Sequence, residues 1–310
     1  MTGRSVEAVR ALSTAEQPVF WHRRRISRYR GSAEELKRLL PRFKRELSGG
    51  TYHIRRADAH GPAAVVGHVS CSYVLVQHHD LLDALPEILG EVGIDWSGLT
   101  GELAVTPHGE RMELVLDLPM PHVIPRDGFP LVCRLRCVNS VDRSSALEAE
   151  LQWYRLVCSN GMFGWTGERV RRQHRFEGAV DWVQRHLRRR FGQVPIDLER
   201  FDSLHQTPVS TGSISDWTDV FVARSWGRTA AAAVYNVCTR GVSGRVLEED
   251  DLPPHALEIE SAFDVPGACA PATNLYHVGQ ALSWVAGQSE TLHARFSRTS
   301  QVPSLLQLLG

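Results

Sequence analysis

The sequence predicts an α+β fold, with a mostly antiparallel, curved sheet and helices in the N-terminal half and a mainly helical C-terminal half. Segments that alternate between apolar and polar residues dominate positions 51–165, and apolar residues at helical spacing dominate positions 166–310. The sequence has no internal repeat and no low-complexity linker. We therefore expect three parts: a basic segment with one helix at 1–50, an antiparallel α+β domain at 51–165, and a mainly helical region at 166–310 packed on it.

The composition is that of a globular chain with a substantial core. Among 310 residues, 43% are apolar and 8% are aromatic, which excludes a disordered or collagen-like protein. No apolar run approaches the roughly 20 residues that span a bilayer, and the N-terminus lacks the apolar core of a signal peptide. We expect a cytoplasmic protein without membrane contact.

A capping box marks the first expected helix. Ser32 stands at the N-cap position and Glu35 at the third helical position, the spacing at which each side chain bonds the other residue's backbone. Apolar residues then recur at helical spacing as far as Leu47, and a Gly-Gly pair at 49–50 ends the run. Pro41 should kink or divide this helix.

Alternation and turn residues place the strands. Around 107–110 and again around 140–143, polar turn residues separate two alternating segments, as in antiparallel hairpins. The alternation also places Cys133 and Cys137 on one buried face. The strands are expected at 51–56, 63–77, 102–106, 111–118, 131–139 and 145–158, with a helix at 80–92.

Helical periodicity predicts the elements after residue 166. The acidic residues of 248–251 precede a Pro-Pro pair and should form a loop, and the tail at 304–309 should pack on a neighbouring element. The helices are expected at 180–191, 197–205, 216–226, 229–239, 273–286 and 289–296.

The sequence lacks motifs for metals, cofactors and nucleophiles. Six cysteines are scattered without a CxxC spacing, and the histidines form no HExxH or zinc-finger pattern. The His-His-Asp run at 78–80 fits the N-terminal turn of a helix better than a metal site. There is neither a phosphate-binding glycine loop nor a nucleophile elbow. We expect no metal and no cofactor, and an enzyme is the less favoured interpretation.

The net charge of zero conceals strongly charged blocks. Residues 1–50 carry a net charge of +7, residues 51–130 carry −7, residues 131–200 carry +5 and residues 201–310 carry −5. Nearly every basic residue is arginine, because lysine occurs only at positions 37 and 44. The planar fork of arginine suits phosphates and stacked bases, although GC-rich coding gives the same bias.

The first group of residues that could carry chemistry lies at the ends of two long strands. Asn139, Ser140 and Asp142 follow one strand and Asn160 follows the next, so the four could form a polar pocket. Asn, Ser and Asp also build Asx-turns, which accounts for the same residues without a function. Asp142 has no acidic neighbour in sequence, so a paired-carboxylate acid and base is not indicated.

The second group is an arginine-rich segment with interleaved aromatics. Eight arginines and two acidic residues lie between positions 169 and 190, a density at which like charges repel one another and an anionic partner would stabilise the fold. Single-stranded nucleic acid is such a partner, because its phosphates bind arginine and its bases stack on aromatics. The expected phosphate contacts are Arg155, Arg171, Arg172, His174, Arg175, Arg188, Arg189 and Arg190, and the expected stacking residues are Trp165 and Trp182.

The arginine-rich segment fits two alternatives equally well. The arginines could form a solvated helix face, or they could pair with the acidic blocks of the same chain, within one molecule or between subunits. The sequence does not separate these alternatives from binding to nucleic acid.

Several stretches between about residues 65 and 245 form a set of motifs, and a Gly-Arg-Thr-Ala stretch follows at 227–230. Their positions are Val69, Ser70, Tyr73, Val76 and His78, then Asn139, Ser140, Asp142 and Ser144, then Arg155, Val157, Cys158, Asn160 and Gly161, with Arg171 and His174 after them. As a set, these stretches resemble the phage/plasmid-like proteins, a bacterial and mobile-element family classed as a domain of unknown function of the DUF932 type, and the Gly-Arg-Thr-Ala stretch is similar to a helical motif of that family.

Two positions depart from the family's pattern. Arg143 follows Asp142 where glycine is common, so a tight left-handed turn is less expected there. Arg228 stands where lysine is usual, which keeps the positive charge. The family has no settled activity, and its presence on phages and plasmids implies a DNA-related or host-conflict role by analogy.

These observations predict a nucleic-acid-binding protein of the mobile-element type that binds or anneals single-stranded DNA and assembles as a homo-oligomer. One alternative is a metal-dependent enzyme that acts on nucleic acid through a pocket of Asn139, Asp142 and Asn160. Another is a protein-interaction module in phage defence or counter-defence, in which basic and acidic blocks pair between subunits.

Overall fold

A computed structural model describes residues 10–11, 20–21, 24–58, 64–120, 131–155, 170–174 and 177–310 of the chain. The chain divides into two compact units. Unit 1 contains Met1–Met120, Cys133–Leu151 and Gly167–Gln193, and unit 2 contains Pro121–Val132, Gln152–Thr166 and Val194–Gly310. The α+β class expected from the sequence is confirmed, since antiparallel strands dominate the first half and helices the second.

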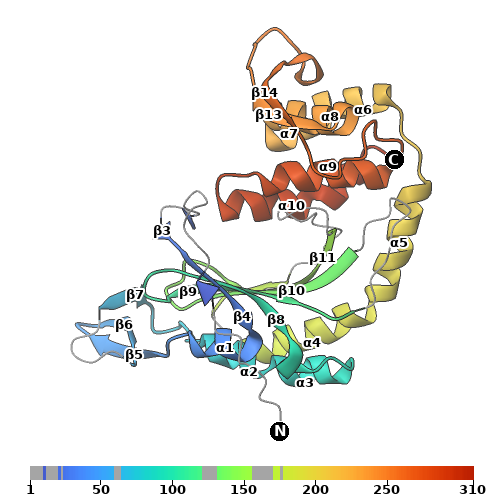
Figure 1. Cartoon of the computed structure of the whole chain (residues 1–310). Helices are drawn as coiled ribbons and strands as arrows, with labels where there is room; N and C mark the ends of the chain where they lie inside the picture. The colour runs from blue at the N-terminus through green and yellow to red at the C-terminus, as the bar shows by residue number, and fades with distance from the viewer. Residues whose placement is uncertain are drawn as a thin grey trace. The chain divides into compact units, whose positions relative to one another are not determined.

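A seven-stranded sheet, most of whose residues belong to unit 1, runs in the order β1-β4-β8-β9-β10-β11-β12 (Figure 1). The two expected hairpins, β8–β9 and β10–β11, lie at its centre. Short backbone pairs β2 (Phe20–Trp21) and β3 (Arg24–Arg25) lie outside it. The strands are β1 (Arg10–Ala11), β4 (Ser27–Ser32), β8 (Thr100–Val105), β9 (Arg111–Asp117), β10 (Leu131–Ser140), β11 (Leu147–Arg155) and β12 (Val170–Arg172).

One face of this sheet is apolar and is covered by helices. Because Leu103, Leu114 and Cys137 are partners in adjacent strands, their side chains share a face, and all three are buried. Cys133, two residues before Leu135 on β10, is buried on the same face, as expected. The helices on this side are α1 (Ala33–Arg38), α2 (His78–Asp83), α3 (Leu85–Glu91) and α4 (Ala179–Gly192) (Figure 1).

The opposite face, here named the charged face, carries arginines and acidic residues at alternate positions. The register pairs Arg134 with Asp117, and their side chains form an ion pair of 2.5 Å. Among the side chains that the structure describes, five arginines and five acidic residues share this face, and the register places Arg10 and Arg171 opposite Arg30 and Glu148 at its edges. The five arginines and five acidic residues are Arg28, Arg30, Glu102, Arg111, Glu113, Asp117, Arg134, Arg136, Glu148 and Glu150.

A second, three-stranded antiparallel sheet of β5 (Phe43–Ser48), β6 (Thr51–Arg56) and β7 (Val65–Val69) is here named the wing. Phe43, Ile54 and Val69 form its core together with Tyr73. Apolar spacing predicts a helix as far as Leu47, and that prediction is wrong. The capping box of Ser32 and Glu35 is present, but α1 ends at Arg38.

The reason is the proline that follows α1. Proline lacks an N–H and disfavours helical backbone in the residue before it, so Pro41 separates α1 from β5 rather than kinking a longer helix. Gly49 and Gly50 have φ values of 58° and 79° and form the turn between β5 and β6. The glycines therefore close a hairpin instead of ending a helix.

Two further boundaries differ from expectation. The strand expected at 63–77 ends at Val69, and a loop leads from there to α2. The helix expected at 80–92 is divided into α2 and α3, because Pro86 occupies the first turn of α3 and cannot continue the hydrogen-bond ladder of α2. His78 does begin α2, and Asp80 accepts the backbone N–H of Gln77, so the His-His-Asp run forms a helix N-terminus as expected.

Unit 2 is mainly helical, with a core between α6, α8, α9 and α10 that includes Trp217, Leu282 and Leu305. The Trp217 indole donates a 2.9 Å hydrogen bond to the Leu305 carbonyl. The helical elements are α5 (Val194–Gln206), α6 (Thr211–Trp217), a π-helical turn (Thr218–Val222), α7 (Ala223–Trp226), α8 (Arg228–Arg240), α9 (Leu275–Gly287) and α10 (Leu292–Gln307).

Unit 2 departs from the sequence expectation in three places. The hairpin of β13 (Val242–Val246) and β14 (Ile259–Asp264) was not expected. The helix expected at 216–226 begins earlier, at Thr211, and the π-helical turn divides it into α6 and α7. The expected helix at 289–296 and the tail at 304–309 are joined in the single helix α10, which continues through Pro303. The other helices of the C-terminal half lie within a few residues of their expected bounds.

The acidic loop between β13 and β14 is held by one arginine. The guanidinium of Arg228, at the first position of α8, donates to the backbone carbonyls of Asp250 at 3.0 Å, Glu249 at 2.6 Å and Leu252 at 2.5 Å. The Thr229 hydroxyl bonds the carboxylate of Glu248. The Gly-Arg-Thr-Ala stretch therefore closes this loop onto the start of α8.

We predict that Arg228→Ala releases the acidic loop while unit 2 stays folded. Three charge-assisted hydrogen bonds are lost, but the arginine is exposed, so the free energy of unfolding should fall by only about 1 kcal/mol. Amide hydrogen exchange at residues 249–252 should become faster. Arg224→Ala, which removes an exposed arginine of α7, is the control, and equal exchange rates in both variants would contradict the prediction.

Candidate functional site

Residues from three distant stretches of the sequence meet at one end of the seven-stranded sheet in unit 1. They come from the loop after β7, the turn between β10 and β11, and the segment after β12. The backbone N–H of Val74 donates to the carbonyl of His174 at 3.0 Å, which joins the first stretch to the third. We name these residues the motif cluster: Tyr73, His78, Asn139, Ser140, Asp142 and His174.

Tyr73 connects all three stretches. Its hydroxyl donates to the carbonyl of Val141 at 3.0 Å, and its ring stacks on the imidazole of His174 with centroids 5.4 Å apart. Burial, with a further contribution from the Asp142 carboxylate, raises the pKa of the Tyr73 phenol. Tyr73 therefore stays protonated and acts as a hydrogen-bond donor.

Asn139 and His78 form a buried neutral pair. The Nε2 atom of His78 lies 2.8 Å from the carbonyl of Gly109, which can only accept, so Nε2 carries the proton. Nδ1 is then the acceptor for the Asn139 amide at 3.1 Å. The same amide donates to the carbonyl of Val76 at 3.0 Å. Burial lowers the pKa of His78 to about 4, so the ring is neutral at pH 7.

The turn after β10 is built by side-chain bonds to its own backbone. The Ser140 hydroxyl accepts from the backbone N–H of Ser145 and donates to its carbonyl, both at 2.8 Å. The Asp142 carboxylate accepts from the N–H of Ser144 at 2.9 Å, an Asx-turn. Arg143 has a φ of 71°, so the expectation that arginine disfavours a left-handed turn here is wrong. The hydrogen bonds of Ser140 and Asp142 to the backbone of the turn hold Arg143 in this left-handed conformation.

The wing touches this turn through a glycine. A Cβ atom at Gly67 of β7 would lie 2.9 Å from the Cα atom of Asp142, so no side chain fits between the two backbones. On the other side of the wing, Arg45 of β5 donates to the carbonyl of Tyr73 at 2.6 Å. The wing is therefore attached both to the turn and to the loop that carries Tyr73.

A cavity of about 190 Å³ opens between the turn and the segment that follows β12. Tyr73, Arg143, Ser144, Gln173 and His174 are among the residues that line it. The ring of His174 is 5% exposed, and among the described residues neither of its nitrogens has a well-aligned hydrogen-bond partner. Burial lowers the pKa of His174 to about 4, against smaller opposing effects of the Val74 backbone and of Asp142.

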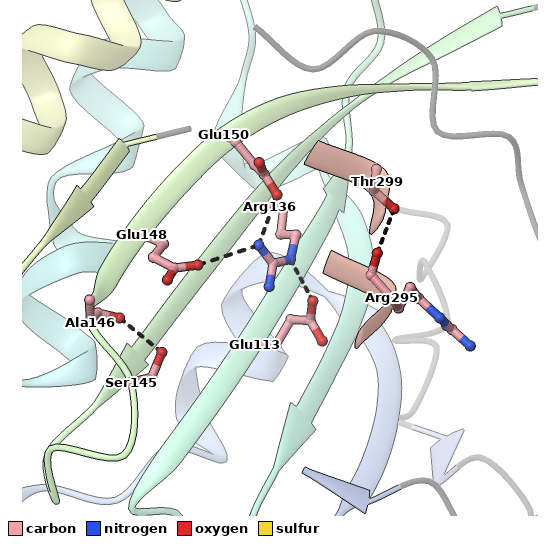
Figure 2. Close-up of polar contacts among 8 residues, drawn as sticks. All are labelled: Glu113, Arg136, Ser145, Ala146, Glu148, Glu150, Arg295 and Thr299. Carbon is pink, nitrogen blue, oxygen red and sulfur yellow. Dashed lines mark hydrogen bonds and ion pairs between the residues drawn. The ribbon is translucent and has the colours of Figure 1, made fainter. Parts of the chain in front are cut away.

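A buried cluster of charges lies on the charged face (Figure 2). The guanidinium of Arg136 on β10 contacts Glu113 on β9 at 2.6 Å, and on β11 it contacts Glu150 at 2.8 Å and Glu148 at 3.7 Å. Burial disfavours the charge of Arg136, but the carboxylates outweigh it and raise the pKa of the guanidinium. Nearby, burial lowers the pKa of Arg111 to about 10. The alternation of charged residues at 111–113, 134–136 and 148–150 is the sequence signal that could have indicated this cluster.

The expected phosphate contacts of α4 face in different directions. Arg188 forms ion pairs with Glu91 at 2.8 Å and Glu87 at 3.0 Å, on the neighbouring helix α3. Arg190 is buried and bonds the side chain of Gln193, at the C-terminal end of α4. Arg189 is exposed and lies 3.4 Å from the imidazole of His186, on which the half-buried Trp182 also stacks.

The remaining expected contact residues are described only in part. Arg155, Arg171 and Arg172 belong to strands by their backbone, and Arg171 is the partner of Glu148 in the register of β11 and β12. The side chains of these three arginines lie outside the described residues. Asn160, Trp165 and Arg175 lie outside them altogether.

The described part of the chain contains no group of three or more His, Cys, Asp or Glu side chains placed to hold a metal ion. Within the same residues, none of the helices has the length and apolar character needed to cross a bilayer. The cysteines at 71, 133, 137, 238 and 269 are free thiols, and burial raises the pKa of Cys238.

A comparison with protein families identifies the chain. The family model "Domain of unknown function (DUF932)" matches residues 65–236, more than half of the sequence. The chain belongs to this family. No curated protein and no solved structure matches it. The DUF932 match runs from β7 to α8 and includes the whole motif cluster, so the sequence motifs of this DUF932 protein meet in space at one site.

We predict that Arg136→Ala destabilises this DUF932 protein by about 3–5 kcal/mol at pH 7, because the change removes the buried guanidinium that contacts three buried carboxylates. In the variant the folded state should take up protons that the unfolded state does not. The difference in the free energy of unfolding between the variant and the wild type, measured by urea unfolding, should therefore shrink as the pH falls from 7 to 5. A difference that does not vary with pH would contradict this prediction.

We also predict that the two buried histidines make the fold sensitive to acid. The unfolded chain binds a proton at each below about pH 6.5, whereas folded His78 and His174 bind one only below about pH 4. The free energy of unfolding should therefore fall by about 3 kcal/mol per histidine as the pH drops through this window.

His174→Phe keeps a ring against Tyr73 and removes the titrating group, so it should weaken the pH dependence of urea unfolding between pH 7 and pH 4. His68→Gln, a change at an exposed position of the wing, is the matched control. If the His174→Phe curve parallels that of the control, the prediction fails.

Proposed function

We propose that the protein binds nucleic acid, with single-stranded DNA as the preferred form, and that it acts in the cytoplasm as a homo-oligomer. The observation that supports this most directly is the basic, exposed wing. Between Arg42 and Asp58 the chain carries five basic and two acidic residues, a net charge of +3. A surface with this excess attracts the phosphate backbone without regard to sequence.

The basic side chains of the wing have carboxylate partners that a phosphate could replace. Lys44 and Arg55 both pair with a single carboxylate, that of Glu46, at 2.7 Å and 3.4 Å. Arg56 pairs with Asp58 at 2.6 Å, also at the surface. Exposed ion pairs of this kind contribute about 0–1 kcal/mol. A phosphate can therefore replace the carboxylate at little cost.

The wing also offers flat and apolar surface beside its charges. The Arg45 guanidinium lies 4.4 Å from the centre of the Tyr52 ring, and Leu47 is 64% exposed. Proteins that bind single strands combine a basic surface with side chains on which bases stack. On the charged face of the large sheet, by contrast, Arg134 is paired with Asp117 and the buried Arg136 with three carboxylates, so these two arginines are less available to a polyanion.

The arginines of α4 contribute less to this proposal than the sequence suggested. Arg189 is exposed and remains a candidate contact, and the backbone positions of Arg171 and Arg172 leave them as candidates too. Arg188 would have to leave two glutamates to reach a phosphate. We therefore assign the first contacts to Lys44 and Arg55 of the wing and to Arg42, which directly precedes β5.

A second candidate, a protein-interaction module, is favoured by the pairing of charges within each unit. Arg188 with Glu87 and Glu91, and Arg228 with the acidic loop, join a basic residue to an acidic segment far away in sequence. Contacts of this kind, between an arginine and an acidic segment, could also join two subunits. Sedimentation without nucleic acid in low and high salt separates the two: self-association that salt abolishes supports the module.

We predict that the wild type binds a labelled single-stranded oligonucleotide and that its affinity falls steeply between roughly 50 and 200 mM salt. Arg42→Gln with Lys44→Gln should weaken binding several-fold and reduce the slope of log K against log salt by about 2, about one per phosphate contact. Fluorescence anisotropy with single- and double-stranded probes measures both quantities.

The control carries the same loss of charge in unit 2, as Arg224→Gln with Arg245→Gln, two exposed arginines. It should bind like the wild type. The proposal fails if the wild type does not bind at low salt, and the assignment to the wing fails if both double variants lose affinity equally.

A further inference from the structure

The cavity beside Tyr73 and His174 has a volume of about 190 Å³. That is below the roughly 300 Å³ at which pockets for drug-sized ligands begin. It exceeds the engineered cavity of about 150 Å³ that takes up one benzene molecule. The space therefore suits a single ring, or a group of that size, rather than an extended ligand.

The polar side chains around the cavity keep unused hydrogen-bonding capacity, while the backbone of the turn does not. The N–H groups of Ser144 and Ser145 are already bonded to Asp142 and to Ser140. The guanidinium of Arg143 and the amide of Gln173 have no hydrogen-bond partner within the part of the chain that the structure describes. His174 is 95% buried, and both of its ring nitrogens are without a well-aligned partner in the described ranges of the chain.

A buried imidazole in this condition that also lines a cavity can take a ligand as its partner. Buried polar atoms are nearly always hydrogen-bonded, and each exception costs about 1–3 kcal/mol. His174 lines the cavity, and the stacking of its ring on Tyr73 fixes its plane. A group that enters the cavity can therefore satisfy it without rearrangement of the fold.

The donor and acceptor pattern decides the chemistry of that group. The neutral imidazole of His174 offers one donor and one acceptor, and the Gln173 amide offers both as well. An anion would use only the donors and would also meet the Asp142 carboxylate nearby. A ring with both donors and acceptors on its edge uses all of them, as in the contacts of glutamine with base edges.

We propose that this cavity binds one unpaired nucleobase, read by His174 and Gln173, while Arg143 at its mouth binds the phosphate of the same nucleotide. The inference deepens the proposed function, since unpaired bases are what a single strand offers. Arg143 suits this position because it is exposed in a left-handed turn at the edge of the cavity. The cavity would add a specific contact to the general attraction of the wing.

The test uses the full chain and four deoxynucleoside monophosphates, with inorganic phosphate as the comparison, by calorimetry and by NMR of ¹⁵N-labelled imidazoles. At least one nucleotide should bind more tightly than phosphate and shift the ring nitrogens of His174. Gln173→Ala, at an exposed position, should weaken that binding about tenfold, the effect of one lost hydrogen bond. Gln307→Ala, an exposed change on α10, should leave it unaltered.

The outcomes separate the cavity from the wing. Equal affinity for phosphate and nucleotides, or no loss in Gln173→Ala, overturns the base site. If oligonucleotides bind but no nucleotide shifts His174, the base site is wrong while binding of nucleic acid stands. If nucleotides bind and oligonucleotides do not, the base site stands and the proposed function falls.

Discussion

One buried guanidinium sets the pairing of the central strands. Arg136 on β10 contacts a carboxylate on β9 and two on β11, and four charged groups are thereby removed from water. Burial of this kind is tolerated only when the charges meet in good geometry. A slip of one residue between strands would turn Arg136 to the apolar face and leave its partners unpaired. The cluster therefore fixes the register of β9, β10 and β11.

That register determines which way the side chains at the end of β10 point. Asn139 faces the helices and holds His78 in one tautomer, whereas Ser140 faces the turn and closes it onto Ser145. The residues that match the family's motifs thus build the architecture of the site. His174 differs from Tyr73 and Ser140, because among the described residues its buried ring has no well-aligned partner for either nitrogen. The proposed base site rests on this difference.

Local signals in the sequence were sufficient for the class of the fold, for the β8–β9 and β10–β11 hairpins and for the capping box at Ser32. They failed where one pattern fits two structures: the apolar spacing from Leu36 to Leu47 suits a helix, but Pro41 divides it. At Arg143 the intrinsic preference of the residue was overruled by its neighbours. The cavity was not predictable, because its walls come from segments about 30 to 70 residues apart whose meeting depends on the register of the sheet.

The glycine at position 67 sets how closely the wing approaches the β10–β11 turn. Because its backbone lies directly against that of Asp142, no side chain stands between them. A side chain introduced at position 67 would therefore have to displace either β7 or the turn, and the next residue of that turn, Arg143, lines the cavity. The spacing between the wing and the wall of the cavity is thus set by a missing Cβ atom.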